Sequence, residues 1–424
     1  MKLALILIGL ISSTFAFAET RFVQIKAATR EERSTIANLG ISIESVMSDS
    51  VWGFASDEER ASLRQNQFKI LGDFTVETGR GGHDSGFDFP AKDEKFHTYA
   101  QMEAALFKLQ SENSELVKIQ SIGKSFEGRD LWAAHINSSV ASLASGTSGK
   151  PGVVFMGAHH AREHLSLEVP LMLAQYLLQN KTEPKIARLL NERDIWIMPL
   201  INPDGAEFDI SKSKYQLWRK NRSDNHDRSF GVDLNRNYGF KWGTGGSSTR
   251  TSSEVYKGPA PFSELETQAV RDFVDSHLNL KTLLSFHSYS ELILYPWGHT
   301  FEAIGNARDL SVFKKMARTM AQWNHYTPEA SSALYIASGD TTDWAYGEHG
   351  IFAFTFELSP ATQWAGGFYP GEKVIDRVFQ DNLVPCLYLL DVTADPYQVI
   401  DARVSPGLSI LPEPAIPVGD FWQP

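Results

Sequence analysis

Residues 157–164 read Gly-Ala-His-His-Ala-Arg-Glu-His and directly follow the apolar run Val153-Val154-Phe155-Met156. An apolar run of this length is typical of a buried strand. Three imidazoles, one guanidinium and one carboxylate then fall within six residues, at the point where a helix is expected to begin. A single histidine in such a place is often merely exposed or hydrogen-bonded. The cluster as a whole favours a bound metal ion, because these side chains are common metal ligands.

Two kinds of metal site fit this stretch. His160, Glu163 and His164 match the H-x-x-E-H string of inverted zinc peptidases, in which both histidines bind zinc and the glutamate is the base. Alternatively, His160 and Glu163 both bind the metal, and a third ligand comes from far downstream. The chain has one cysteine, Cys386, so the ligands of a zinc site must be His, Asp or Glu. The string alone leaves both arrangements open.

The composition is that of an ordinary globular protein. The chain has 424 residues, enough for two or three domains, and 42% of them are hydrophobic and 21% charged. The net charge of −11 argues against nucleic acid or an anionic membrane as a partner. The single cysteine excludes an intramolecular disulfide.

The N-terminus predicts export. Lys2 precedes an apolar run from Leu3 to Ile11, and Ala16-Phe17-Ala18 supplies an A-x-A cleavage pattern. This pattern predicts a signal peptide over residues 1–18, since the apolar run is too short to span a bilayer. The alternative is a membrane anchor. We therefore expect a secreted protein, extracellular or periplasmic, with no membrane association after removal of the signal.

Residues 19–73 predict a small α+β domain. The expected elements are, in order, a strand, a helix, two strands, a helix and a strand, over residues 21–26, 29–39, 41–47, 51–56, 57–66 and 68–71. This β-α-β-β-α-β order is the split βαβ arrangement. Residues 74–95, glycine-rich and polar at their centre, predict an exposed, cleavable linker. A propeptide and a zymogen are the expected consequence; a permanent binding module is the alternative.

Residues 96–394 predict one α/β catalytic domain with a mixed, mostly parallel twisted sheet flanked by helices. Ligands of such sheets collect at the carboxyl ends of the strands, where His160 lies. Residues 395–424 are rich in proline and predict an extended tail. Strands are expected over 116–122, 130–137, 153–157, 194–200, 283–286, 292–295 and 352–356, and helices over 99–109, 165–178, 262–277, 310–323 and 372–390.

Further polar residues interrupt apolar strands. His287 ends one such strand, and Glu357 stands in the apolar run 354–358. A buried carboxylate needs a partner such as a metal ion or an arginine. Residues 218–222 and 231–237 are rich in arginine, which in an acidic protein suggests the capture of a substrate carboxylate; a solvated basic loop is the alternative.

Taken together, these motifs resemble the zinc metallocarboxypeptidases of the carboxypeptidase A/B type, and most closely bacterial carboxypeptidase T. The resemblance extends from about residue 96 to residue 394. It rests on many ordered motifs: His160-Ala161-Arg162-Glu163, Leu217-Trp218-Arg219-Lys220, Val232-Asp233-Leu234-Asn235-Arg236-Asn237, Ser285-Phe286-His287-Ser288-Tyr289, Leu334-Tyr335 and Phe354-Thr355-Phe356-Glu357-Leu358.

The resemblance implies one zinc ion on His160, Glu163 and His287, a His₂Glu set like that of carboxypeptidase A. Glu357 would be the general base, and Arg219 would polarise the scissile carbonyl. The remaining implied roles are these: Asn235, Arg236 and Tyr335 grip the terminal carboxylate, Arg162 assists further out in the cleft, and Asp233 orients His160.

Two positions depart from the family pattern. His159 and His164 stand where relatives usually carry apolar or aromatic residues, and they create the H-x-x-E-H match. We reject the inverted zinc peptidase because it leaves His287, Glu357 and Arg219 without a role.

The specificity residues implied by the resemblance are Thr342, Asp340 and Ala330. They predict the release of large apolar residues and also of Lys or Arg through the Asp340 carboxylate. The alternative is that Asp340 only caps the turn at Gly339 and faces solvent.

The expected partners are peptide or protein C-termini as substrate and an activating protease, and the chain is expected to be a monomer. Two other functions are kept as alternatives: a related peptidase acting on peptidoglycan stems, and a catalytically inactive peptide-binding module.

Overall fold

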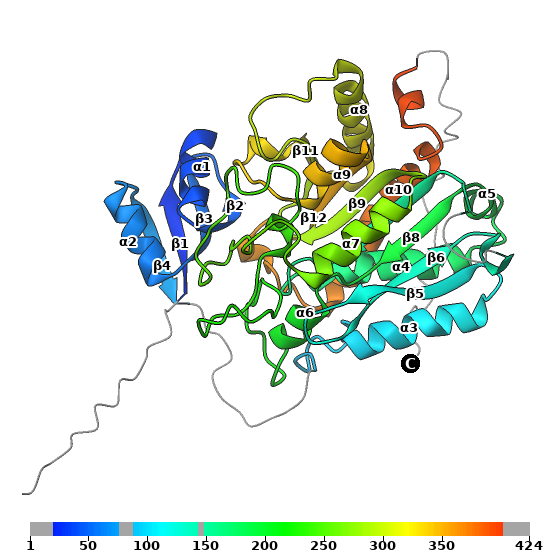
Figure 1. The fold of residues 1–424 in the computed structure, drawn as a ribbon, viewed down its shortest axis with the longest axis horizontal. Coiled ribbons are helices and arrows are strands. Elements are labelled where there is room, and N and C mark those ends of the chain that lie inside the picture. The colour runs from blue at the N-terminus through cyan, green and yellow to red at the C-terminus, as the bar shows by residue number, and fades with distance from the viewer. Residues whose placement is uncertain (1–19, 76–87, 143–147, 402–424) are drawn as a thin grey trace, which may run out of the picture.

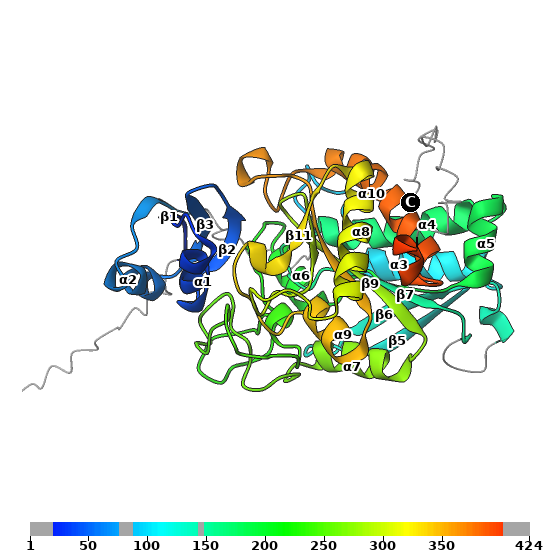
Figure 2. The same cartoon turned by 90° about the horizontal axis from the view of Figure 1, so that it is seen from above.

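The computed structural model describes residues 20–75, 88–142 and 148–401. They form a small N-terminal domain beside a larger α/β domain, and both views place the small domain at one end of the large one (Figures 1 and 2). The predicted signal peptide, most of the predicted linker and the tail beyond residue 401 lie outside the described residues. No helix in the described part of the chain is long and apolar enough to cross a membrane.

The small domain is a four-stranded antiparallel sheet in the order β2-β3-β1-β4 with two helices. Both helices begin with a capping box, Thr29 with Glu32 and Ser56 with Glu59, which satisfies free backbone N–H groups at the helix start. The β-α-β-β-α-β prediction is confirmed. The elements are β1 Arg21–Lys26, α1 Arg30–Asn38, β2 Ser42–Val46, β3 Ser50–Ala55, α2 Asp57–Gln65 and β4 Ile70–Thr75.

The large domain is built on an eight-stranded mixed sheet in the order β11-β10-β12-β9-β7-β8-β6-β5. The four central strands β12, β9, β7 and β8 run parallel, whereas β10 joins β12, β6 joins β8 and β5 joins β6 antiparallel. The mixed sheet is thus confirmed. Its strands are β5 Val117–Lys124, β6 Asp130–Ile136, β7 Gly152–Gly157, β8 Asp194–Met198, β9 Leu280–Ser288, β10 Leu292–Tyr295, β11 Thr327–Ala330 and β12 Phe352–Leu358.

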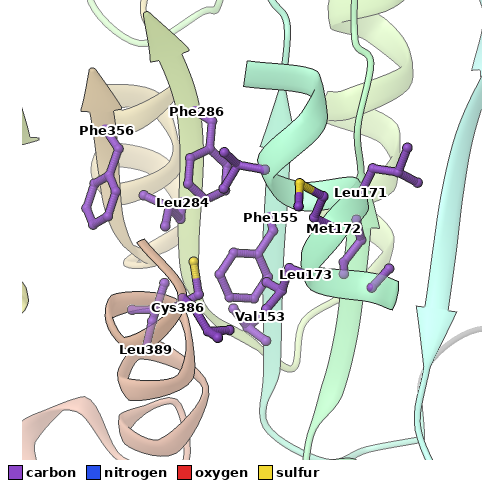
Figure 3. Packing of buried hydrophobic residues seen from close by; sticks show 14 of the residues in the cluster. Val153, Phe155, Leu171, Met172, Leu173, Leu284, Phe286, Phe356, Cys386 and Leu389 are labelled. Carbon is purple, nitrogen blue, oxygen red and sulfur yellow. The ribbon is translucent and has the colours of Figure 1, made fainter. Parts of the chain in front are cut away.

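Helices cover both faces of this sheet, so its central strands are apolar on both sides. Along β7, Val153 and Phe155 face α4 and α10, whereas Val154 and Met156 face the layer of α7 and α9 (Figures 2 and 3). This alternation is the two-residue period of a strand. The helices are α3 Tyr99–Glu112, α4 Leu165–Gln179, α5 Pro184–Glu192, α6 Pro203–Asp209, α7 Leu265–Ser276, α8 Ala307–Asn324, α9 Thr341–His349 and α10 Ile375–Val392.

Several elements differ from the sequence prediction. The helices α5, α6 and α9 and the strand β11 are additional. α6 begins at the predicted Asn202-Pro203 turn, because the Asn202 side chain accepts a hydrogen bond from the Gly205 N–H and Pro203 suits the first helical position.

The ends of the predicted linker and tail are also packed rather than exposed. Phe89, expected in the exposed linker, is buried against Phe96 and His164. The short 3₁₀ helix Pro396–Ile400 lies in the predicted extended tail, and the Tyr397 hydroxyl donates to Asp309 at 2.7 Å. Aromatic side chains hold both segments to the domain.

Candidate active site

The carboxyl ends of three parallel strands bring the candidate site together. Glu357 of β12 stands opposite His287 of β9. On the other side of β9, Phe286 stands opposite Gly157, the last residue of β7. His160 and Glu163 follow β7 directly. Strand pairing therefore brings His160 and Glu357, which are about two hundred positions apart in the chain, to the same edge of the sheet.

His160, Glu163 and His287 form a buried set whose ligand atoms all lie within 4.8 Å of one another. The two oxygens of Glu163 are 2.7 Å from His160 Nδ1 and 2.9 Å from His287 Nδ1. The two Nδ1 atoms are themselves only 3.2 Å apart. Burial lowers the pKa of His287, although Glu163 opposes this, and a neutral imidazole is the form that binds metal. The donor set therefore fits a zinc ion.

The remaining contacts of His160 and Glu357 agree with a cation at this place. The other ring nitrogen of His160, Nε2, lies 3.1 Å from the buried carboxylate of Asp233, the usual outer partner of a ligating histidine. Burial and the neighbouring Glu163 raise the pKa of Glu357 well above its ordinary value, while Arg219 acts in the opposite direction. A carboxylate in such surroundings needs a nearby positive charge to ionise.

Arg219 is held firmly at the edge of the cleft. Its Nε and Nη2 atoms both lie 3.0 Å from Asp233 Oδ2, and its backbone carbonyl accepts from the Ala161 N–H at 2.9 Å. The side chain is buried yet lines the cleft together with Glu357. A fixed guanidinium in this position can stabilise negative charge that develops on a substrate oxygen.

His159 and His164 point away from the metal set. His164 Nε2 lies 2.8 Å from Asp209 Oδ2, and His159 Nε2 lies 2.9 Å from the Tyr238 hydroxyl. Neither belongs to the group of possible ligands among the described residues. The geometry agrees with rejecting the inverted zinc peptidase.

The three residues expected to grip a carboxylate line one cleft of about 570 Å³ beside the metal set. Arg236 is anchored by hydrogen bonds from Nε to the Gly246 carbonyl and from Nη1 to the Asn235 carbonyl. Asn235 and Tyr335 also reach this cleft. An arginine, an amide and a phenol thus converge within one cavity.

Asp340 begins α9 and also lines the cleft. Its Oδ1 accepts from the backbone N–H groups of Thr342 and Asp343, whereas its buried Oδ2 has no hydrogen-bond partner. Burial, and next the neighbouring Asp343, raise the pKa of Asp340 to about 7. The side chain is therefore a helix cap, but it does not face solvent, and Thr342 lines the cleft beside it.

Ala330 does not line the cleft, contrary to expectation. It stands on β11 opposite Tyr295 and packs against the main hydrophobic core. Its neighbours Glu329 and Ser331 line the cleft instead. The reason is the alternation of side chains along a strand, which sends consecutive residues to opposite faces.

The small domain contributes Glu44, a residue that the sequence prediction omits and that binds Arg162 of the large domain. Arg162 is fully buried, and its Nη2 donates to Glu44 of β2 at 2.7 Å, while Nη1 donates to Glu254 at 3.0 Å. Its guanidinium also lies between the rings of Phe54 and Phe368, 4.7 and 4.5 Å from their centroids. A carboxylate in a half-buried edge strand was the available signal for Glu44.

Comparison with known proteins agrees with a zinc site. Residues 102–384 match the family Peptidase_M14, zinc carboxypeptidase. A zinc carboxypeptidase of Saccharothrix mutabilis subsp. capreolus is 33% identical over 388 residues, which cover 87% of this chain and 88% of that protein. Carboxypeptidase A4 of Mus musculus is 33% identical over 303 residues, 69% of this chain and 70% of that protein.

Solved structures show the same fold. The carboxypeptidase A of Helicoverpa armigera has a TM-score of 0.73 at 25% identity, over 91% of this chain and 99% of that one. The chain therefore belongs to the zinc carboxypeptidase family, the zinc-dependent exopeptidases that hydrolyse peptides.

Proposed function

We propose that this protein is a secreted carboxypeptidase, made as a zymogen, that releases single C-terminal residues from peptides. The observation that carries the proposal is a His₂Glu metal set beside one cleft, which is lined by the half-buried Glu357 and by side chains able to bind a carboxylate. The metal set and Glu357 supply hydrolysis. The arginine, amide and phenol restrict it to the end of a chain.

In this proposal one zinc ion binds His160, Glu163 and His287. When bound, it supplies Lewis acidity and makes water a nucleophile near neutral pH. Glu357 accepts a proton from the attacking water, as a general base at hydrogen-bonding distance would. Arg219, held by Asp233, stabilises the oxygen of the scissile carbonyl as negative charge develops on it.

Recognition of the terminal carboxylate falls to Asn235, Arg236 and Tyr335. An arginine can accept a carboxylate in two parallel hydrogen bonds, which fixes both its place and its orientation. An internal peptide segment has no such carboxylate and would leave these donors unpaired, which costs binding free energy. The enzyme is therefore an exopeptidase.

Mass spectrometry of a defined peptide mixture tests this function. We expect a loss of single C-terminal residues from L-peptides, with no cleavage of internal bonds. Muropeptides with D-residues are offered in parallel. Cleavage of muropeptides alone would assign the protein to peptidoglycan, and binding without cleavage would assign it to peptide-binding modules.

For Asp340 we expect a dual preference for C-terminal residues. Large apolar side chains fit the pocket, and the unpaired Oδ2 would bind the positive end of Lys or Arg. Asp340→Asn should lower kcat/KM on Arg-ended peptides by ~1–3 kcal/mol, the scale of one charged hydrogen bond. Phe-ended peptides of the same upstream sequence serve as the control. An equal loss on both would mean that Asp340 shapes α9 and does not bind the substrate.

The same residue predicts a pH dependence. The pKa of Asp340 is raised to about 7, so its carboxyl is neutral below that pH and charged above it. The ratio of kcat/KM for Arg-ended over Phe-ended peptides should therefore rise between about pH 6 and pH 8. Asp340→Asn should remove this rise. A ratio that stays flat in the parent enzyme would contradict the assignment.

The proposed zymogen rests on contacts between the small domain and the cleft. Besides the Glu44–Arg162 ion pair, the Tyr335 hydroxyl donates to the Ile43 carbonyl at 3.3 Å. Residues 43–47 line the same cleft as Glu357 and Asn235. β2 is an edge strand of its sheet. Since its residues line the cleft, we propose that it hinders a peptide from reaching the metal set.

We expect the precursor to be weakly active and a cut in the linker, near Arg80, to release activity. Glu44→Gln should raise the activity of the uncut precursor severalfold, because Arg162 loses a buried ionic partner. Hydrolysis of a chromogenic peptide is measured before and after treatment with a trypsin-like protease. Arg80→Gln is the matched uncut control. Equal activity of the precursor and the cut enzyme would mean that the small domain does not inhibit the enzyme and only assists its folding.

A further inference from the structure

The side-chain hydrogen-bond partners of His159 are Tyr238, Thr341 and Ser285, none of which lines the cleft. Its ring is fully buried and stacks on His287, with centroids 5.5 Å apart and an interplanar angle of 13°. Nε2 lies 2.9 Å from the Tyr238 hydroxyl and 3.1 Å from Thr341 Oγ1, and Nδ1 lies 3.4 Å from Ser285 Oγ. An apolar residue at this position could fill the space but could not make these contacts.

Thr341 contacts Asn235 as well as His159 and so connects the two residues. The backbone N–H and the hydroxyl of Thr341 both donate to Asn235 Oδ1, each at 3.0 Å. A backbone N–H can only donate, so the side-chain atom that it faces must be the amide oxygen. The amide nitrogen of Asn235 is thereby left free for the cleft, where a carboxylate can accept from it.

The direction of the hydrogen bonds connects all three residues. Because the Thr341 hydroxyl proton is used on Asn235, its oxygen is left to accept from His159 Nε2. Thr341 is almost fully buried, so no solvent replaces that donor. If the donor is lost, the Thr341 hydroxyl can turn its proton toward the Tyr238 hydroxyl, which it also contacts. Asn235 then loses one of the two hydrogen bonds that set its amide.

We propose that His159 is a positioning residue for recognition of the C-terminal carboxylate, acting through Thr341 on the amide of Asn235. This inference rests on the proposed exopeptidase function. Asn235 touches the substrate and His159 does not. The structure links residue 159, which precedes a proposed zinc ligand, to the start of α9, which carries Asp340 and Thr342.

The test uses the mature, zinc-loaded enzyme with three single variants. His159→Leu removes the donor, His159→Gln retains a donor of similar reach, and Thr341→Val interrupts the same connection from its other end. We expect His159→Leu and Thr341→Val each to raise KM about tenfold with kcat changed less than twofold, the scale of one hydrogen bond at a charged group. His159→Gln should keep KM close to the parent value. All three variants should retain their full zinc content.

A double variant and a binding measurement separate positioning from packing. In His159→Leu/Thr341→Val the two effects should not add, because both act on the same amide. Calorimetry in a Glu357→Gln background compares a peptide bearing a free C-terminal carboxylate with the same peptide amidated. His159→Leu should weaken binding of the free carboxylate alone. Additive losses, or equal weakening of both peptides, would overturn the inference.

Failure of this inference can be distinguished from failure of the proposed function. If the parent enzyme binds the free and amidated peptides equally, the exopeptidase proposal itself fails. If the parent discriminates between them and His159→Leu discriminates equally well, only the role of His159 is overturned. If His159→Leu does not fold, as judged by its thermal transition, the single variants Thr341→Val and His159→Gln are compared instead. Thr341→Val should then weaken binding of the free carboxylate alone, and His159→Gln should not.

Discussion

Glu357→Gln should retain zinc and bind peptide normally, yet turn over at least about 100-fold more slowly, the range expected when a general base is removed. The amide has nearly the same shape as the carboxylate but cannot accept the proton of the attacking water. Glu357 is a half-buried carboxylate in an otherwise apolar strand, and it lines the cleft together with Arg219, His160 and Glu163. The rate of hydrolysis of a peptide that ends in Phe gives kcat, and elemental analysis gives the zinc content.

The control for this prediction is Glu329→Gln. Glu329 also lines the cleft, but it belongs to β11 and is not part of the proposed machinery. It should keep kcat within a few-fold of the parent value. A near-normal kcat in Glu357→Gln would mean that the base lies elsewhere.

His287→Ala should abolish stable zinc binding and with it activity. Three protein ligands hold a catalytic zinc ion, and the loss of one leaves only His160 and Glu163. His160→Ala and Glu163→Ala should behave alike. Zinc content per chain after dialysis, measured by elemental analysis, checks the assignment without reference to activity.

The matched control is His164→Ala, which lies directly beside Glu163 in sequence. Because His164 bonds Asp209, this variant should keep its zinc while losing some thermal stability. Loss of zinc in His164→Ala would restore the inverted zinc peptidase arrangement. Full zinc occupancy after His287→Ala would remove His287 from the ligand set.

Much of the framework follows from local sequence patterns. The two helices of the small domain and the apolar run of β7 depend on residues close together in the chain, so they could be predicted from sequence. The short helices α6 and α9 are harder to predict. Their starts at Asn202-Pro203 and Gly339-Asp340 are equally good turns, and only packing decides that a helix follows.

The pocket shows a similar division. The family resemblance implies that Asp340 and Thr342 lie near the substrate, and both line the cleft. It also suggests Ala330, whose side chain faces the core because its place in the β11 alternation depends on pairing with β10. Glu44 cannot be connected with Arg162 from sequence, since the two residues are 118 positions apart and belong to different domains.

By itself, the sequence determined the chemistry that this protein has available: a His-rich turn after a strand, a carboxylate in an apolar strand, and arginines for a substrate carboxylate. Only the tertiary structure decided that, of the histidines at 159, 160 and 164, it is His160 that faces Glu163 and His287. The direction of each ring depends on a partner far along the chain. Asp209 is 45 positions from His164, and Tyr238 is 79 positions from His159. Buried polar atoms must find partners, and those partners are supplied by packing.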